Sequence, residues 1–487
     1  MILIIYVAVR MNATSKLTYL HEETTMKRIT KIILPVIMLG VIAGCDDDDN
    51  GSGTITPPEP QTPQAMVRVI HGSPDAPAVN VVAAGSAVEA LSNLDFAMGT
   101  EFLSLDEGTY PLTVDAILAD GSTTQVLDLG DVELMGDYEY TVFAHGTVTD
   151  MTLAPAVVAN PVMPVGDGNI RVQVLHGSSI APMVDLHVTG VDDELGEPLA
   201  TLMYGDVTGQ VEVPAGVYRV RLVVAEGESM GAVAFDAVLP DLPAGADLFV
   251  AATTNTGVPT SPVFLLANDG TDTLKIIDDR TQAWVRVVHA AADVPNVDIL
   301  VNGNKVDALS NAPFTGVTGN VPVDPGTYMV DTVLTADNSV VGITGDLMLE
   351  ADMKYTVNAV GTLSGDDDAP LEYYVQMDTG RMVATEAQVR LTHAHPSVGN
   401  VDIYVTADGD IANVDPVWSD VPFKADTGFA SLPPGDYVVQ VTLTGTKTIA
   451  IDTGMITLMG GKVYAATAVD NPMGMPANLI LMDAFTE

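Results

Sequence analysis

The sequence predicts an all-β protein, arranged as a tandem array of four antiparallel β-sandwich domains. The first indication is a short pattern that occurs four times, each time as alternating apolar residues followed by a histidine. The second is the spacing within each copy, where strand-like segments of about five to eight residues are separated by Gly, Pro, Asp and Asn. Helical periodicity is absent over any useful length. Seven or so strands in roughly 100 residues are typical of an immunoglobulin-like sandwich, and we expect that architecture in each copy.

The four copies are defined by aligning their openings. These read VRVIH, VQVLH, VRVVH and VRLTH, and they end at His71, His176, His289 and His393. The alignment predicts domains at residues 65–160, 167–270, 283–380 and 386–487, which we call repeats 1 to 4. Because linked domains of this kind keep separate hydrophobic cores, we expect a change in one repeat to leave the other three cores largely untouched.

The residues before repeat 1 predict a lipoprotein of the bacterial cell envelope. Residues 26–44 begin with basic residues and continue as an apolar run shorter than the about 20 residues that span a bilayer, which is typical of a signal peptide. The tetrapeptide IAGC, which ends at Cys45, resembles the bacterial lipobox, and this resemblance implies that Cys45 carries a lipid.

The segments on either side of this signal have their own predictions. Residues 45–64 are predicted to be the lipidated cysteine and a flexible, acidic and Pro-rich tether. Residues 1–25 are interpreted as an over-extended start before the natural initiator Met26, with a genuine longer leader as the alternative. The choice between the inner and the outer membrane stays open.

The chain is strongly acidic, with 19 Lys and Arg against 64 Asp and Glu and a net charge of −45. Five of the basic and two of the acidic residues precede residue 46, so the mature chain would carry a charge of −48. Such a charge repels nucleic acid and anionic lipid surfaces, and no nucleic-acid partner is expected. With Cys45 acylated, no thiol is left for a disulfide, so stability must come from hydrophobic cores.

Two further positions recur at fixed places in the repeats. Nine residues after each histidine, one polar residue lies between apolar ones: Asn80, Asp185, Asp298 and Asp402. A tyrosine two residues after a glycine recurs as Tyr110, Tyr218, Tyr328 and Tyr437. This step is comparable to a tyrosine corner, in which the phenolic hydroxyl ties a loop back to the sandwich. In repeat 3, the pair Asn302-Gly303 between two strand-like segments predicts a two-residue hairpin.

These motifs resemble those of a bacterial extracytoplasmic family, the domain-of-unknown-function family 4397. The segments VRVIHGSPDAPAVNV and VRVVHAAADVPNVDILVNG carry the resemblance, together with DPGTYMVD and EADMKYTVNAVGTL. The likeness is clear in repeats 1 and 3 and weaker in repeats 2 and 4. In repeat 2, Leu248 stands where repeats 1 and 3 have Tyr140 and Tyr355. The resemblance implies a secreted or envelope-anchored β-sandwich module and brings no catalytic residues.

Strand alternation predicts a structural role for the recurring histidine. Val67 and Val69 share their parity with His71, so we expect the histidine on the core side of its strand. A half-buried imidazole would then donate a hydrogen bond to a carbonyl of the loop that follows. The polar residue nine positions later is expected on the outward face of its own strand, which disfavours an acid–base pair. A metal site, which needs three or four converging ligands, and catalysis by the histidines are the less favoured alternatives.

Arginines of the opening strands have the opposite parity. Arg68, Arg286 and Arg390 are expected on an outward, solvated face, where at most an exposed pair with the Asp or Asn of the neighbouring strand would form.

Two other patterns could carry chemistry. The string GESMG around Ser229 matches the G-x-S-x-G motif of serine hydrolases, but it lies between two strand-like segments, where we expect a hairpin loop. Acidic loops at residues 366–368 and at Asp408, Asp410 and Asp415 offer oxygen ligands that calcium prefers, although solvated loops are the favoured interpretation. No other cofactor is indicated.

We therefore predict a non-enzymatic, lipid-anchored envelope protein whose sandwich modules serve binding, adhesion or structure. An envelope polysaccharide or a protein is the expected kind of ligand, and loops at the sandwich ends are the default binding surfaces. The alternatives are an envelope hydrolase or carbohydrate-active enzyme, with Ser229 or scattered carboxylates as its candidate residues, and a mechanical spacer.

Overall fold

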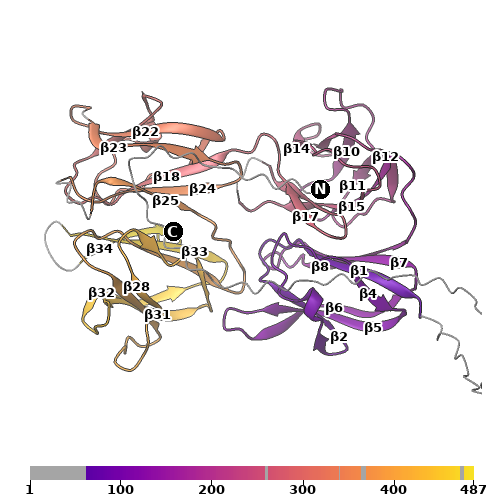
Figure 1. Cartoon of the computed structure of the whole chain (residues 1–487), viewed down its shortest axis with the longest axis horizontal. Helices are drawn as coiled ribbons and strands as arrows, with labels where there is room; N and C mark the ends of the chain where they lie inside the picture. The colour runs from indigo at the N-terminus through magenta and orange to yellow at the C-terminus, as the bar shows by residue number, and fades with distance from the viewer. Residues whose placement is uncertain (1–61, 258–260, 339, 364–368, 472–476, 487) are drawn as a thin grey trace, which may run out of the picture. The chain divides into compact units, whose positions relative to one another are not determined.

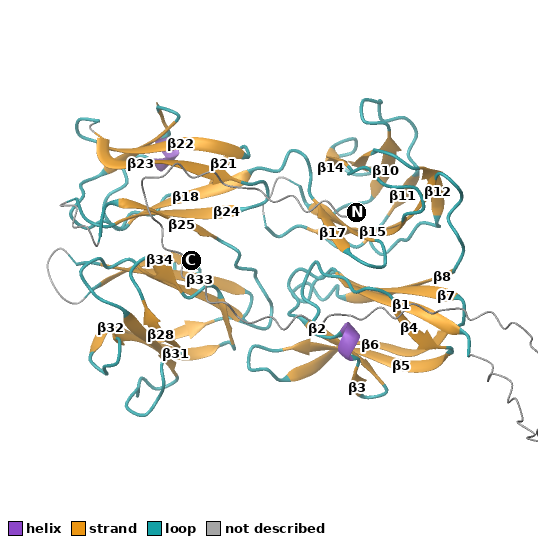
Figure 2. Cartoon of the chain, viewed as in Figure 1, coloured by secondary structure: helices purple, strands orange, loops and turns teal. Residues whose placement is uncertain are grey.

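The computed structural model describes residues 62–487, except for 258–260, 339, 364–368, 472–476 and 487. The described residues fold into β-sheets, with two short 3-10 helices (Figures 1 and 2). The prediction of an all-β protein is confirmed. No helix among these residues has the length and apolar character that crossing a membrane requires. The predicted start, signal peptide, Cys45 and nearly all of the tether lie outside the described residues.

Repeat 1 forms two sheets of four strands each. The sheet that contains the opening strand, here called the opening sheet, has the order β4-β1-β7-β8, and the second sheet has the order β3-β2-β5-β6. Their bounds are β1 (Gln64–His71), β2 (Val79–Ala83), β3 (Ser86–Ala87), η1 (Glu89–Leu91), β4 (Leu103–Asp106), β5 (Gly108–Ile117), β6 (Thr123–Leu134), β7 (Tyr138–His145) and β8 (Ala154–Pro161).

Repeat 2 has the same arrangement with one additional strand, β17, at the edge of its opening sheet. The opening sheet has the order β12-β9-β15-β16-β17, and the second sheet has the order β11-β10-β13-β14. The bounds are β9 (Asn169–His176), β10 (Val184–Thr189), β11 (Ala200–Leu202), β12 (Val211–Pro214), β13 (Arg219–Val224), β14 (Val233–Val238), β15 (Asp247–Thr254), β16 (Val263–Asn268) and β17 (Thr273–Ile276).

Repeats 3 and 4 repeat this topology. Their opening sheets are β21-β18-β24-β25 and β29-β26-β33-β34, with β30 also paired to β26, and their second sheets are β20-β19-β22-β23 and β28-β27-β31-β32. In repeat 3 the bounds are β18 (Ala283–His289), β19 (Val297–Val301), β20 (Asn304–Lys305), η2 (Asp307–Leu309), β21 (Val321–Val323), β22 (Gly326–Leu334), β23 (Val340–Leu349), β24 (Lys354–Val360) and β25 (Glu372–Met377). In repeat 4 they are β26 (Ala387–His393), β27 (Val401–Thr406), β28 (Trp418–Val421), β29 (Ala425–Asp426), β30 (Ala430–Leu432), β31 (Gly435–Leu443), β32 (Ile449–Leu458), β33 (Lys462–Val469) and β34 (Asn478–Asp483).

The prediction of purely antiparallel sheets is wrong for one pairing in each repeat. The opening strand runs parallel to its neighbour in the pairs β1–β7, β9–β15, β18–β24 and β26–β33. A parallel pair needs a long crossover connection, and here the connection contains the strands of the second sheet and at least one further strand of the opening sheet, such as β4 in repeat 1. The sequence pattern did not reveal this, because side chains alternate with a period of two in parallel and antiparallel strands alike.

The predicted hairpin in repeat 3 is present. Asn302 and Gly303 connect β19 to β20 with φ angles of 50° and 77°. A two-residue turn with positive φ at both positions matches the right-handed twist of the strands it joins, and Asn-Gly favours it because both residues tolerate this conformation.

The hydrophobic core of each repeat lies between its two sheets. Val67 and Val69 on β1 are each 3% exposed and face this core in repeat 1. Arg68 between them is also buried, at 4% exposure, so both faces of the opening strand are covered. The outward, solvated face predicted for Arg68, Arg286 and Arg390 is therefore wrong.

The repeats also share hydrophobic clusters, contrary to the expectation of separate cores. A cluster formed by repeats 1 and 2, which we call the 1–2 cluster, contains Ile70, Phe143, Leu175, Phe249, Ala251, Phe264 and Leu266. A 3–4 cluster contains Val288, Ala290, Val360, Ala394, Ala465, Val469, Ile480 and Met482. Residues Gln61–Glu487 accordingly form one compact unit. The alternation of apolar and polar residues predicts which side chains share a face of a sheet. It does not predict whether another repeat covers the second face.

Candidate functional site

The four recurring histidines make the same hydrogen bond. Each Nε2 donates to the carbonyl of the residue six positions later, at 3.0 to 3.1 Å; the pairs are His71 with Pro77, His176 with Pro182, His289 with Pro295 and His393 with Gly399. The imidazoles are almost fully buried, at 0 to 3% exposure, rather than half-buried as expected. Each ring therefore joins the end of its strand to the loop that follows.

Burial favours the neutral form of three of these imidazoles, those of His71, His289 and His393. It lowers the pKa of His71 to about 4, although the bond to the Pro77 carbonyl acts in the opposite direction. Burial also lowers the pKa of His289 and of His393. Among the described residues, no group of three or more His, Cys, Asp or Glu side chains is arranged to hold a metal ion. The geometry is that of a neutral donor within the fold.

An aromatic ring lies edge-on to the histidine in three repeats. The pairs are His71–Phe96, His289–Phe314 and His393–Phe423, with ring centroids 6.1 to 6.3 Å apart and interplanar angles of 76° to 79°. None of the sequence patterns pointed to these phenylalanines. The available signal was a Phe that recurs in repeats 1, 3 and 4 before the next strand of the opening sheet, which is β4, β21 or β29.

The polar residue nine positions after the histidine holds a different loop. Its side-chain oxygen accepts the backbone N–H of Asn93, Asn311 or Asp420, at 2.8 to 2.9 Å, in repeats 1, 3 and 4 respectively. These three residues have positive φ angles of 53° to 58°, so the acceptor stabilises a strained bend. In repeat 2, Asp185 accepts a hydrogen bond from the hydroxyl of Thr201 instead. The histidine and the polar residue thus bind separate loops.

The recurring tyrosines make the hydrogen bond of a tyrosine corner. Each hydroxyl donates to the carbonyl of the residue four positions earlier, at 2.6 to 2.9 Å; the pairs are Tyr110 with Asp106, Tyr218 with Pro214, Tyr328 with Asp324 and Tyr437 with Pro433. Each of these hydrogen bonds therefore fixes the short loop before the tyrosine to the strand that begins near it.

Two loop carboxylates were also missed by sequence reasoning. In repeat 1, Asp75 accepts the backbone N–H groups of Val148 and Thr149, each at 2.8 Å. In repeat 3, Asp293 accepts the N–H of Leu363 at 2.9 and 3.1 Å. Both lie in the loop directly after the histidine, so their recurrence at one loop position was the available signal.

The arginine of the first opening strand connects repeats 1 and 2. Arg68 donates through Nε to Thr141 at 2.8 Å, and its terminal nitrogen donates to the side chain and the carbonyl of Asn268 at 2.8 and 3.0 Å. Its guanidinium also lies 4.6 Å from the ring centroid of Phe102. A buried arginine with this set of acceptors acts as a bridge between two β-sheets.

The corresponding arginines of repeats 3 and 4 share carboxylates. Arg286 donates to Asp483 at 2.6 and 3.1 Å and lies 3.2 Å from Asp378, and Arg390 also binds Asp378. Their side chains are 6% and 3% exposed. None of these carboxylates is the Asp of the neighbouring strand that the sequence suggested, because the real partners are Asp378, directly after β25, and Asp483, at the end of β34.

Another arginine joins the beginning and the end of the compact unit. Arg381 precedes repeat 4, and it donates to the carbonyls of Pro74 and Ala76 at 2.7 Å each and to Asp95 at 2.8 Å. The loop that follows the first histidine is therefore also a contact with the connection before repeat 4.

The candidate catalytic serine lies on a hairpin loop. Ser229 is exposed between β13 and β14, and the backbone bond from Ala232 N–H to its carbonyl closes the turn. A nucleophile elbow requires a strand before the serine and a helix after it. Two strands flank this loop, so it does not have the geometry of an elbow.

The candidate calcium loops are only partly described. In repeat 4, Asp408 and Asp410 accept backbone N–H groups of their own loop, at 3.0 and 2.9 Å. The cluster at residues 366–368 lies outside the described residues. For Asp408 and Asp410, the hydrogen bonds within the turn are a sufficient reason for an acidic residue at these positions.

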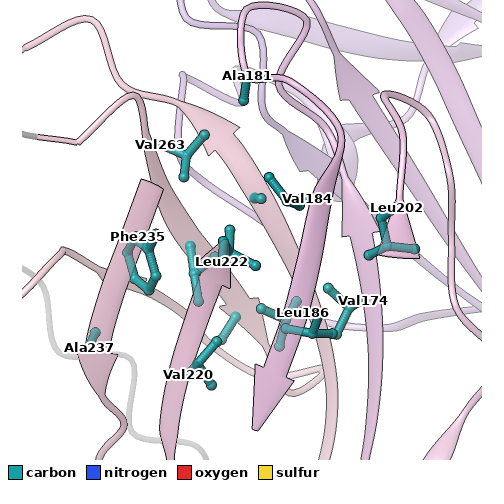
Figure 3. Close-up of a cluster of buried hydrophobic side chains, with 14 residues drawn as sticks. Val174, Ala181, Val184, Leu186, Leu202, Val220, Leu222, Phe235, Ala237 and Val263 are labelled. Atoms are coloured by element: carbon teal, nitrogen blue, oxygen red, sulfur yellow. The ribbon is translucent and has the colours of Figure 1, made fainter. Parts of the chain in front are cut away.

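A large apolar cavity lies in repeat 2. Its volume is about 630 Å³, and side chains of both sheets line it, among them Val174, Leu186, Val220 and Leu222. Figure 3 shows these four within the surrounding hydrophobic cluster. Ligand pockets in proteins typically measure about 300–1,000 Å³ and are mostly apolar. The cavity therefore has the size and lining of a site for a small molecule.

Comparisons with known proteins give one family. The model of a domain of unknown function (DUF4397) matches residues 65–187 and 283–404, which together make up half of the chain. No curated protein matches. Solved structures that match include two crystal structures of BcpA, the major pilin subunit of Bacillus cereus, one of them of a variant. Each is 9% identical over 63% of this chain and 99 to 100% of the pilin chain, with TM-scores of 0.14 and 0.15, which are too low to carry an argument.

Proposed function

Since the chain belongs to the DUF4397 family, whose domain has no known function, we propose that it is a lipid-anchored envelope protein with a non-catalytic structural or binding role. Its repeats are the modules, and we infer one sandwich each at residues 65–160, 167–270, 283–380 and 386–487. The signal-peptide pattern and the lipobox-like end at Cys45 support the anchor.

The observation that carries the proposal is the burial of the outward faces of the opening sheets. In a chain of independent modules these faces would be solvated. Here the 1–2 cluster, the 3–4 cluster and the arginine bridges cover them. The side chains on these outward faces thus hold the repeats together in one unit and do not form four separate surfaces. Such a unit suits a scaffold that presents its loops at a distance from the membrane.

The anchor is tested by replacing the lipidated residue. In cells that express the chain from Met26, Cys45→Ser should abolish incorporation of labelled fatty acid and leave the protein uncut or released from membranes. Ser52→Ala, in the predicted tether, is the matched control and should fractionate as the wild type does. Identical fractionation of the Cys45 variant and the wild type would refute the lipoprotein assignment.

A binding role and a purely mechanical role differ in their ligands. We expect residues 61–487, the compact unit, to bind an envelope polysaccharide, peptidoglycan or an envelope protein in a glycan-array and pull-down screen. Saturable binding with a defined stoichiometry would support the binding role. Absence of binding to every one of these would leave the spacer as the structural role.

A further inference from the structure

The interior of the sandwich differs among the four repeats. The cavity between the sheets measures about 50 Å³ in repeat 1 and 40 Å³ in repeat 3, compared with 330 Å³ in repeat 4 and 630 Å³ in repeat 2. The four repeats share their topology, except that repeat 2 has the additional strand β17, whose Leu274 and Ile276 line its cavity. Two core side chains also differ among the repeats, in the same order as the volumes.

The first side chain is a leucine of a 3-10 helix. Leu91 on η1 and Leu309 on η2 are 3% and 4% exposed and lie in the cores of repeats 1 and 3, where they line the small cavities. The described residues of repeats 2 and 4 contain no such helix. The two repeats without this leucine are the two with large cavities.

The second side chain is a tyrosine on the strand parallel to the opening strand. Tyr140, Tyr355 and Tyr464 are 3 to 5% exposed, and each hydroxyl accepts the backbone N–H of the residue five positions earlier, at 2.8 to 3.1 Å. In repeat 2 this position is Leu248, which pairs with Val172 in the same register. The residue five positions earlier is Pro243, which has no N–H.

Repeat 2 therefore lacks both the aromatic ring and the donor that would bind its hydroxyl. Leu248 and Pro243 both line the cavity. Repeat 4 retains the tyrosine but lacks the leucine, and its cavity is intermediate in volume. Repeat 2 lacks both the tyrosine and its N–H donor, and an unfilled cavity of this size would lower the stability of the core. The combination indicates that the cavity is a binding site.

The lining of the cavity restricts the class of ligand. Its walls are mostly Val, Leu, Ile, Ala and Pro side chains, and the few polar lining residues include His176, Thr208 and Asp247. At roughly 30 Å³ for each water-sized group, the cavity has room for about 20 of them. Leu199 and Leu274, which are 47% and 49% exposed, also line it, so it reaches the surface. The exposed carboxylates Asp269 and Asp272 lie at this opening, in a chain that carries a charge of −45, and they disfavour an anionic head group.

We propose that the repeat-2 cavity binds one neutral apolar molecule, such as a long-chain alcohol or another uncharged lipid-like compound. This function is independent of the anchor and of the scaffold role. It gives repeat 2 a specific task, since its cavity has nearly twice the volume of the cavity in repeat 4.

The experiment measures binding of the neutral dye Nile red to residues 61–487. We expect a blue-shifted increase in fluorescence with one site per chain, and displacement by dodecanol at concentrations at least tenfold lower than by laurate. Leu248→Phe fills the cavity without adding a hydroxyl that lacks a donor, and it should weaken dye binding at least tenfold. Leu443→Phe, the same substitution at a 43% exposed position that does not line the cavity, is the control and should bind as the wild type does.

A second variant keeps the proposal testable if Leu248→Phe does not fold. Leu248→Tyr combined with Pro243→Ala restores the tyrosine and its N–H donor, so it should fold and melt no lower than the wild type while losing the dye. Folded variants that bind Nile red as tightly as the wild type would overturn the proposal. Equal displacement by laurate and dodecanol would overturn the restriction to neutral ligands.

Discussion

At the scale of single residues, the recurring side chains mainly satisfy backbone groups at the ends of strands. The histidine, the tyrosine and the polar residue nine positions after the histidine each bind a carbonyl or an N–H of a neighbouring loop. A buried or strained loop needs such a partner, because an unpaired backbone group costs free energy. Their recurrence is therefore explained by the fold itself.

The tyrosine hydroxyl can be removed without changing the packing of its ring. Tyr328→Phe eliminates the 2.7 Å bond to the Asp324 carbonyl and should lower the free energy of unfolding by about 0.5–1.5 kcal/mol. Tyr138→Phe, at a tyrosine whose hydroxyl has no hydrogen bond within the described part of the chain, should change it by less. Urea denaturation measures both, and an equal effect of the two variants would contradict the tyrosine-corner role.

Acid should weaken the fold through the buried histidines. The pKa of His71 falls from 6.5 to about 4 on folding because burial disfavours its charged form. Below pH 6.5 the unfolded chain takes up a proton that the folded chain does not, so this contribution, at most roughly 3 kcal/mol, is present above pH 6.5 and is lost as the pH falls toward 4.

The test follows the free energy of unfolding against pH. For the wild type, the free energy of unfolding should decrease between pH 6.5 and pH 4. His71→Gln should reduce the slope of this decrease by an amount that corresponds to the uptake of up to about one proton. The two proteins should have parallel curves above pH 7. Parallel curves throughout the acid range would show that His71 is not the group responsible.

At the scale of elements, the opening sheets are the surfaces that join the repeats. Their inward faces form the sandwich cores, as the parity of Val67 and Val69 predicts, and their outward faces carry arginines that bind acceptors on a neighbouring repeat or connection. Burying a charge is favourable only when it is paired and hydrogen-bonded. The carboxylates that bind Arg286 therefore matter more than an exposed ion pair would.

Removing the charge of Arg286 should be strongly destabilising. Arg286→Ala leaves Asp483 without its bidentate partner and Asp378 with Arg390 alone, and we expect a loss of about 3–5 kcal/mol in the free energy of unfolding. Arg219→Ala, which breaks the more exposed pair with Asp236 inside a single sheet, should lower the free energy of unfolding much less. Similar costs in thermal and urea unfolding would disprove the role of Arg286 as a bridge.

At the scale of the whole molecule, residues Gln61–Glu487 form one compact unit. The 1–2 cluster contains Phe143 of repeat 1 and Phe249 of repeat 2, whose ring centroids are 6.1 Å apart. Apolar contacts across a boundary couple the stability of the two sides. Repeats 1 and 2 should therefore respond together to a change in this cluster.

A pair of matched substitutions tests this coupling. Phe249→Ala in the 1–2 cluster and Phe235→Ala in the core of repeat 2 alone should each cost about 3–5 kcal/mol. Only Phe249→Ala should also speed hydrogen exchange in β1 and β7 of repeat 1. Unchanged exchange in these strands for both variants would support independent modules instead.

Local features of this protein were determined by its sequence alone. Alternation placed Val67, Val69 and His71 on one face, the Gly-x-Tyr step indicated the bonds of Tyr110 and its three counterparts, and Asn302-Gly303 specified a hairpin. Each of these depends on residues close in the chain, where backbone geometry and side-chain parity leave few choices.

Long-range features were decided only by the tertiary structure. The parallel pairing of β1 with β7, the burial of Arg68 and the shared clusters all join residues more than 70 positions apart. A period of two is the same for a solvated face and for a face covered by another sheet, so the pattern around Arg68 could not reveal its partner Asn268. The cavity of repeat 2 likewise depends on how side chains of its two sheets, such as Leu248 and Leu222, pack against each other, because a void is the space that several packed side chains together fail to fill.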